Sequence, residues 1–393
     1  MRTSARSWML RVALLLVGAC LGNIAAAAQG TPHYLITNDD VSAFLSSVSF
    51  YAIGANGRIT LQQIVPTDGF GIGGGYFGAN RLAVLNSSDN QCVYASDAAT
   101  GDIVGIAVNT LTVSSSTLGS SSDTGASNGI GLATNGQYLY AGYSDSSNIG
   151  TFQIQPGCSL SFINDTSVIG LQGGIVDAMA VHGNLLVVTY GDGSIQSFNV
   201  SGGTPVSNGD EQNSTAAIRA QGATYPSSID ITQDGHFALF GDTATAAVVE
   251  VSDISSGQLT KTVAYQNVGS ISASNILLSP DETMLYISNT QGDRVSAAFF
   301  NKSTGQLALG CASNLLKGYS SHWSYIGGLA QPSTSGNGGG VYAAEFGNPA
   351  TIALVEVHSS GGTCSMLEPS QSPVVDFSSP GLLSIGTFPP RSF

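Results

Sequence analysis

The chain of 393 residues has 25 Asp and Glu against 11 Lys and Arg, which gives a formal net charge of −14. Such an excess of carboxylates repels phosphate backbones, so nucleic acid is not an expected partner. Only 9% of the residues are charged, whereas 50 are Gly. Solubility therefore rests on small hydroxyl and amide side chains, a composition typical of tightly turned β-structure outside the cell.

Residues 1–28 are organised like a secretory signal peptide. Three Arg accompany an apolar run from Trp8 to Leu21, and the small residues Ala25–Ala28 offer a cleavage site. The run is shorter than the about twenty residues that a membrane span needs, and nothing later is long and apolar enough. We expect an exported, periplasmic or extracellular protein with no transmembrane segment. Residues 17–20 also resemble a bacterial lipobox, and cleavage there would instead place a lipid anchor on Cys20.

A short apolar strand pattern returns about every fifty residues along the rest of the chain. Its copies are residues 34–37, 93–96, 139–142, 186–189, 238–241, 285–288 and 341–344. Six of the seven copies follow a second apolar run, joined to it in most cases by a turn rich in Asn, Asp, Gly or Pro, and each copy leads into an alternating stretch. Four short strands at this period describe a propeller blade, whereas a pair of β-sandwich domains does not require such a period.

The first copy lacks a preceding run, and residues 382–387 near the other end of the chain read like the missing innermost strand. We therefore predict an all-β, seven-bladed β-propeller over residues 29–393, closed by a C-terminal innermost strand. Closure leaves no open sheet edge along the ring. We expect this single domain to be a monomer.

Four cysteines remain after removal of the signal peptide, and an even count in an exported chain suggests two disulfides. Cys92 and Cys158 belong to adjacent blades, as do Cys311 and Cys364. We prefer the pairings 92–158 and 311–364 among the three that four cysteines allow. The alternative is four buried free thiols, which pack like small apolar residues.

An acidic position follows the second strand of most blades, on the face where the innermost strands begin. The residues are Asp39 or Asp40, Asp97, Asp145, Asp192, Asp242, Asn289 and Glu345. Carboxylates suit a hard divalent cation such as Ca²⁺ bound in the channel, which makes the acidic members candidate metal ligands. Turns favour Asp and Asn in any case, so a structural role is the alternative. No other cofactor is expected.

The segment before the innermost strand of the last blade contains His322, Trp323 and Tyr325. His322 is the one histidine expected near the channel mouth, and the two aromatic rings offer stacking faces for a sugar or another ring-shaped ligand. We predict a binding site here, with His322 as the candidate catalytic residue. In the alternative, His322 lies on a surface loop and Trp323 packs between blades.

Residues 276–289, with 293–295 and 304–307, resemble the blade signature of lactonase-type propellers, a family that includes bacterial phosphogluconolactonases and fungal muconate-cycloisomerising enzymes. The resemblance implies lactone hydrolysis by polar residues at the starts of the innermost strands: an Arg-His pair, a Glu and a His. Ser227 and Ser228 stand where the Arg-His pair would fall, Asn275 where the Glu would fall, and Asn128 near the His.

A lactone hydrolase needs a general base and a group that stabilises the oxyanion. Ser and Asn donate hydrogen bonds but are not bases near neutral pH. We therefore expect a lactonase-like propeller that binds a small-molecule or carbohydrate-like ligand through His322, Trp323, Tyr325, Asn275 and Ser228, with lactone or ester hydrolysis left open. The alternative is a non-catalytic recognition or scaffold propeller that binds another protein of the cell envelope.

Overall fold

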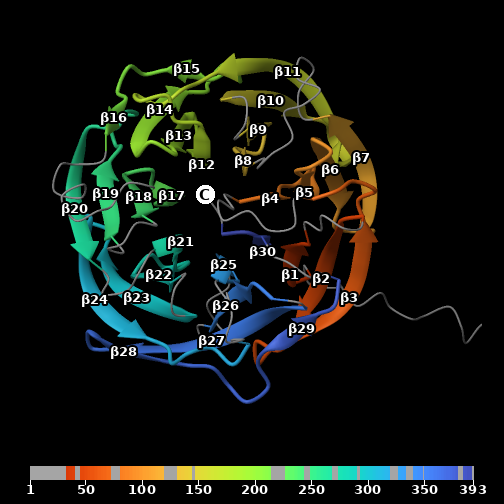
Figure 1. Cartoon of the computed structure of the whole chain (residues 1–393), viewed down its shortest axis with the longest axis vertical. Coiled ribbons are helices and arrows are strands. Elements are labelled where there is room, and N and C mark those ends of the chain that lie inside the picture. Colours follow the sequence, from red (N-terminus) through yellow and green to blue (C-terminus); the bar gives the residue numbers. More distant parts are fainter. Residues whose placement is uncertain are drawn as a thin grey trace, which may run out of the picture. The chain divides into compact units, whose positions relative to one another are not determined.

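The computed structural model divides the chain into two compact units, Met1–Pro32 and His33–Phe393. It describes residues 32–39, 45–71, 80–118, 131–143, 147–213, 226–242, 248–267, 273–289, 293–318, 326–332, 340–347, 349–378 and 384–391. The predicted signal peptide and Cys20 lie outside these residues. The second unit is built almost entirely of β-strands, arranged as seven sheets around a ring (Figure 1).

Each sheet is a blade whose four strand positions run from the centre of the ring outward (Figure 1). Blade 1 consists of β30 (Ser384–Phe388), β1 (Tyr34–Asn38), β2 (Ser47–Ile53) and β3 (Ile59–Pro66). Blade 2 consists of β4 (Leu82–Asn86), β5 (Gln91–Asp97), β6 (Asp102–Ala107) and β7 (Thr112–Leu118). Blade 3 consists of β8 (Gly131–Thr134), β9 (Tyr138–Tyr143), β10 (Asn148–Ile154) and β11 (Leu160–Ser167), with the 3-10 turn η1 (Pro156–Cys158).

The fourth strand position is divided in two of the remaining blades. Blade 4 consists of β12 (Val176–His182), β13 (Leu185–Tyr190), β14 (Ser194–Asn199), β15 (Val206–Ser207) and β16 (Gln212–Asn213). Blade 5 consists of β17 (Pro226–Ile231), β18 (Phe237–Asp242), β19 (Val248–Asp253) and β20 (Lys261–Asn267). Blade 6 consists of β21 (Ala273–Leu278), β22 (Met284–Asn289), β23 (Arg294–Asn301) and β24 (Gln306–Ala312). Blade 7 consists of β25 (Ile326–Ala330), β26 (Gly340–Glu345), β27 (Ala350–Ser360), β28 (Thr363–Leu367) and β29 (Val374–Asp376).

The second strand of each blade is apolar along its length because neighbouring blades cover both of its faces. Every residue of β13 and of β22 is buried, for example, whereas the outermost strand β24 is largely exposed. A strand that is covered on both faces reads as a continuous apolar run, and one that is half covered alternates. This explains why the repeat in the sequence is clearest at the second strand.

The ring closes as predicted, through antiparallel pairing of β30 with β1. The register runs from Tyr34 opposite Phe388 to Asn38 opposite Ser384. Phe388 is 1% exposed and packs in a cluster that includes Ile36 and Val93. The last strand of the chain therefore joins the hydrogen bonding of blade 1 to the packing between blades 1 and 2.

Turns between the third and fourth strands contain glycine where the backbone requires it. Gly57 and Gly305 have φ angles of 75° and 69°, in the left-handed region that residues with a Cβ avoid. The first lies in the turn between β2 and β3, and the second lies in the turn between β23 and β24. The same chemistry recurs at other blades and keeps the period of the repeat regular.

Two disulfides join adjacent blades, with the pairings predicted from the sequence. Cys92 in β5 bonds to Cys158 in η1, which links blades 2 and 3, and Cys311 in β24 bonds to Cys364 in β28, which links blades 6 and 7. The Cα atoms are 5.6 Å apart in both pairs. The alternative of four free thiols is wrong.

No helix within the described residues is long and apolar enough to span a bilayer.

Replacing Phe388 with Ala should lower the free energy of unfolding by about 3–5 kcal/mol, because a fully buried ring is lost from the strand that closes the propeller. Phe377→Ala is the matched control, since that ring is 86% exposed and its loss should change stability by no more than about 0.5 kcal/mol. Urea unfolding followed by circular dichroism measures both. Equal effects of the two substitutions would contradict the closing role of β30.

Candidate functional site

Several of the predicted site residues lie outside the described part of the chain. These are His322, Trp323, Tyr325, Asp145 and Asn128, and the side chains of Ser227 and Asp242 are also outside it. Their predicted roles therefore stay predictions. The described residues nevertheless define the wall of the channel and one of its ends.

The seven innermost strands enclose a cavity of about 250 Å³. Most of its wall is apolar, with Val84, Ala180, Leu277 and Ile385 contributed by four different blades. The polar and charged residues that line it are Asn80, Thr134, Asp230, Asn275, Gln331, Thr387 and Arg391. Pockets that are mainly apolar with a few convergent polar groups are the usual form of small-molecule sites.

Asn275 is the predicted ligand-binding residue that the structure places in the cavity wall. Its side-chain Nδ2 donates to the carbonyl oxygen of Gly327 in the neighbouring blade at 3.0 Å, which fixes the orientation of the amide. Ser228 is 8% exposed and does not line the cavity, although it directly precedes Ile229 and Asp230, which do. The structure thus brings Asn275 to the channel and leaves Ser228 behind its wall.

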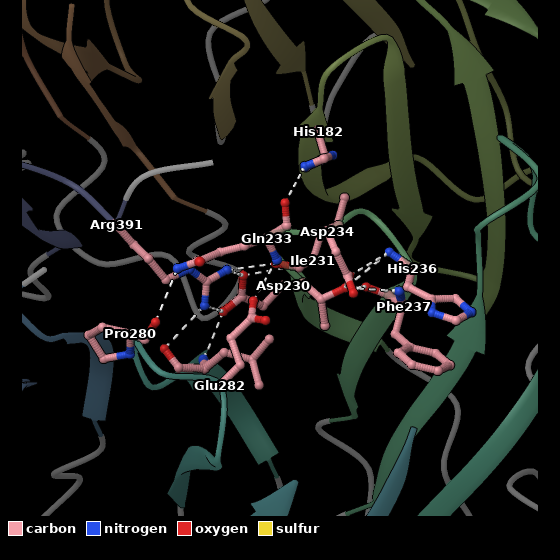
Figure 2. A network of polar contacts seen from close by, with 12 residues as sticks. His182, Asp230, Ile231, Gln233, Asp234, His236, Phe237, Pro280, Glu282 and Arg391 are labelled. Carbon is pink, nitrogen blue, oxygen red and sulfur yellow. Dashed lines mark hydrogen bonds and ion pairs between the residues drawn. The ribbon is translucent and has the colours of Figure 1, made fainter. Parts of the chain in front are cut away.

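An ion pair between Arg391 and Asp230 lies against the cavity (Figure 2). The Arg391 Nη2 donates to Asp230 Oδ1 at 2.6 Å, and its Nη1 donates to Asp230 Oδ2 at 3.1 Å. The two remaining Nη hydrogens go to backbone carbonyls, of Ile231 at 2.6 Å and of Leu278 at 3.1 Å. Such a two-pronged contact is the strongest arrangement of a guanidinium with a carboxylate.

Asp230 is held from the other side by the backbone. Its Oδ1 accepts from the amide of Ile231 and its Oδ2 from the amide of Leu278, both at 2.8 Å. The side chains of Arg391 and Asp230 are only 9% and 12% exposed. Apart from each other, both charged side chains therefore hydrogen-bond with backbone groups of Ile231 in blade 5 and Leu278 in blade 6.

The residues after β30 cross the channel to reach this pair. Phe388 ends β30 in blade 1, and Arg391 contacts the ends of β17 in blade 5 and β21 in blade 6. We call residues 389–391 the C-terminal strap. Pro390 and Arg391 line the cavity, so the strap forms its floor at the end where the innermost strands finish.

Hydrogen bonds on the same face tie the neighbouring blades together (Figure 2). Glu282 accepts from the backbone amide of Gln233 at 2.5 Å, and the side chain of Gln233 donates to the carbonyl of Pro280 at 3.1 Å. His182 donates from Nε2 to the carbonyl of Gln233 at 2.9 Å. Burial lowers the pKa of His182, which keeps the ring neutral near pH 7. The network links blades 4, 5 and 6 beneath the strap.

Sequence reasoning did not identify the pair of Asp230 and Arg391. Asp230 was visible only as a polar residue in the middle of an innermost apolar run, and Arg391 lies beyond the strand that closes the ring. A charged residue in a strand that faces the channel was the available signal, because such a charge needs a partner. Nothing in the sequence pointed to a partner 161 residues away.

The described members of the acidic set are each engaged by hydroxyls nearby. Ser47 donates to Asp39 at 2.5 Å, Thr67 to Asp97 at 2.9 Å, Ser194 to Asp192 at 2.6 Å and Thr351 to Glu345 at 2.7 Å. Within the ranges that the structure describes, no three His, Cys, Asp or Glu residues gather closely enough to hold a metal ion. These contacts accord with the structural role of the acidic positions, and the cation remains a prediction.

Burial shifts the pKa of three of these carboxyls upward. It raises the pKa of Asp39 to about 7, with a further contribution from the neighbouring Asp376, and it raises that of Glu345 to about 7. The pKa of Asp97 rises to about 6 for the same reason. Asp192 behaves differently, because its partial burial is outweighed by hydrogen bonds from Ser194, Gln172 and Gly174, which lower its pKa.

These shifts predict that stability falls as the pH rises from about 4 to about 7. In the folded state Asp39 and Glu345 keep their protons up to about pH 7 and Asp97 up to about pH 6, whereas all three release them at lower pH when the chain is unfolded. Urea unfolding at several pH values should show this slope, and Asp39→Asn should make it shallower. Asp192→Asn is the control, since a lowered pKa acts only at more acidic pH and should leave the slope unchanged. A slope of the opposite sign would refute the burial of protonated carboxyls.

Breaking the ion pair between Asp230 and Arg391 should strongly destabilise the fold. Asp230→Asn leaves the Arg391 charge buried without its counter-ion, which should lower the free energy of unfolding by about 3–5 kcal/mol. Glu356→Gln removes one partner of the exposed pair with His358, at 4.0 Å, and should cost at most about 1 kcal/mol. Thermal unfolding of both variants tests the difference. Similar melting temperatures would show that the strap is not anchored by this pair.

Seven four-stranded blades around a mainly apolar cavity define a seven-bladed β-propeller. Within this class, the sequence profile described as "Lactonase, 7-bladed beta-propeller" matches residues 92–372, well over half of the chain. The chain belongs to this lactonase family, in agreement with the resemblance seen in its blade signature. No curated protein matches it in a sequence search.

Solved structures with the same fold have low sequence identity to this chain. A functionally unknown protein from Desulfotomaculum acetoxidans is 14% identical and has a TM-score of 0.63, covering 90% of this chain and 98% of its own. A protein from Lactobacillus plantarum is 13% identical with a TM-score of 0.65, covering 91% and 98%. A candidate 6-phosphogluconolactonase from Bacteroides uniformis is 15% identical with a TM-score of 0.54, covering 72% and 82%. At such identities the likeness concerns the fold alone.

Proposed function

We propose that this propeller is an exported protein that binds a small molecule in its central channel. The observation that supports this most is the cavity of about 250 Å³, whose apolar wall is interrupted by a few polar groups from different blades. Asn275 is one of them, and its amide is held in a fixed orientation by Gly327. The two disulfides support export, because such bonds persist in oxidising compartments.

Binding is better supported than hydrolysis by the residues in the wall. Of the described residues that line the cavity, only Asp230 and Arg391 ionise, and they are joined to each other. A carboxylate that is neutralised by a guanidinium and two backbone amides is a poor general base. The described wall thus offers neither a base for an attacking water nor an uncommitted cation for an oxyanion.

Lactone hydrolysis is the second candidate, and membership of the lactonase family favours it. Under this hypothesis His322 is the base, with Trp323 and Tyr325 as binding residues. These three precede β25, whose Leu329 and Ala330 line the cavity. The reaction would then take place at the mouth where the innermost strands begin, opposite the strap.

The two candidates are separated by a panel of sugar and aliphatic lactones. Purified wild type and His322→Ala are assayed for turnover, with spontaneous hydrolysis subtracted, and for binding by ligand-observed NMR. His358→Ala serves as the matched control, because that side chain is 68% exposed on an outer part of blade 7. We expect binding without turnover in all three proteins.

Saturable turnover that is lost in His322→Ala and kept in His358→Ala would establish hydrolysis instead. Absence of both turnover and binding would reject a small-molecule function and favour a recognition or scaffold role at the cell envelope.

A further inference from the structure

We propose that the channel selects an uncharged ligand with a hydrocarbon body over anions and over polyhydroxylated rings such as sugars. This inference rests on the proposed binding function and names the chemical class of the ligand. Three separate features support it: the saturation of Arg391, the apolar wall of the cavity, and the distribution of exposed apolar side chains between the two faces of the ring.

An arginine in a cavity wall would ordinarily predict an anionic ligand, because a guanidinium binds carboxylate and phosphate in a two-pronged manner. Here the two Nη atoms already donate to both oxygens of Asp230 and to the carbonyls of Ile231 and Leu278. An anion would have to break these bonds and would meet the Asp230 carboxylate beside them. The formal net charge of −14 also repels an anion at longer range.

Three other polar side chains of the wall are engaged within the protein. Thr134 donates from Oγ1 to the carbonyl oxygen of Tyr138 at 2.9 Å. Thr387 donates in the same way to the carbonyl oxygen of Gln331 at 3.0 Å. The amide of Asn275 is held by the hydrogen bond described above. A ring with many hydroxyls would find few side-chain partners here, and each hydroxyl that gives up water without a replacement weakens binding.

The wall itself offers contacts to hydrocarbon. Four half-buried apolar side chains from different blades line the cavity: Val84, Ala180, Leu277 and Ile385. Most other residues of their strands are buried, so the cavity accounts for the exposure of these four. A cavity of about 150 Å³ lined by Leu, Ile and Phe is large enough for benzene. This one measures about 250 Å³, and a six-membered carbon ring therefore fits.

Exposed large apolar side chains are distributed unequally between the two faces of the ring. Among the described residues outside the strands, all of them lie on the face where the innermost strands begin: Leu45, Phe70, Ile169, Leu171, Ile175, Leu315 and Phe377. No described turn on the face of the strap carries one. Apolar side chains that gather on one face mark a surface that binds. A ligand with a hydrocarbon body would meet apolar surface before it reaches the wall.

The loop that contributes three of these side chains, residues 168–175, is fixed from beneath. Asp192 Oδ2 accepts from the backbone amides of Gln172 at 2.7 Å and of Gly174 at 2.9 Å. The amide of Leu171 donates to the Ser194 hydroxyl at 3.2 Å. The carboxylate of blade 4 thus holds an apolar loop that leads directly into β12, whose Ala180 lines the cavity.

Three probes with the same six-membered carbon ring test this selectivity: cyclohexanol, myo-inositol and cyclohexyl phosphate. Binding to the exported protein is measured by saturation-transfer NMR, with affinities from titration. For the wild type we expect cyclohexanol to bind roughly tenfold or more tightly than myo-inositol, because the wall replaces the water around its carbon atoms and leaves few hydroxyls to satisfy. Cyclohexyl phosphate should show no saturable binding.

A matched pair of variants tests the role of the wall. Leu277→Ser should weaken cyclohexanol binding by roughly threefold or more, since apolar contact is lost. Leu309→Ser is the control, because Leu309 lies in the outermost strand β24 and is 58% exposed. Circular dichroism at the assay temperature establishes that both are folded. Ala180→Ser, which adds a hydroxyl to the wall with little change in volume, provides the same test if Leu277→Ser does not fold.

Binding of myo-inositol or cyclohexyl phosphate as tight as that of cyclohexanol would overturn the inference while leaving the proposed binding function intact. Equal losses in Leu277→Ser and Leu309→Ser would overturn the assignment of the site to the channel wall. If none of the three probes binds, the inference fails, and the lactone panel then decides whether the proposed function fails with it.

Discussion

The antiparallel pairing of β30 with β1 is the contact on which the rest of this structure depends. Every other blade is made from a contiguous segment, so its strands find each other through short turns. Blade 1 alone joins strands that are far apart in the sequence. In its pairing of β1 with β30, Tyr34 lies opposite Phe388. Without that pairing the inner edge of β1 would lie open, the stack of blades would have two ends, and no closed channel would exist.

The same closure places the chemistry of the channel floor. A strap that begins at a buried strand end and crosses to the opposite blades can hold its arginine against Asp230 with little freedom. The ion pair in turn fixes the ends of β17 and β21, since Arg391 and Asp230 together engage backbone groups of Ile231 and Leu278. Architecture and electrostatics are therefore coupled: the closed ring positions the two charges, and the ion pair holds residues 389–391 at the channel.

The features that could be predicted from the sequence are those that depend on local periodicity. The apolar run of each second strand, the Gly turns and the assignment of cysteines to adjacent blades all follow from a repeat that is readable residue by residue. The closing strand was also predictable, because blade 1 visibly lacks a member that residues 382–387 resemble. The prediction failed where pairing is non-local and has no motif, as for Asp230 and Arg391. The hydroxyl partners of the acidic residues were missed for a related reason, because Ser and Thr are so abundant that no single one stands out.

The order of the strands along the chain also affects biosynthesis, because β30 follows the strands of all the other blades. Blades 2 to 7 can form one after another as the polypeptide emerges, whereas blade 1 must wait with an unpaired edge until residues 384–388 arrive. A product that lacks residues 384–391 retains that edge and lacks the floor of its cavity. The closed state is therefore reached only when residues 384–388 pair with β1, and until then the unpaired backbone of β1 can pair with the strands of other chains.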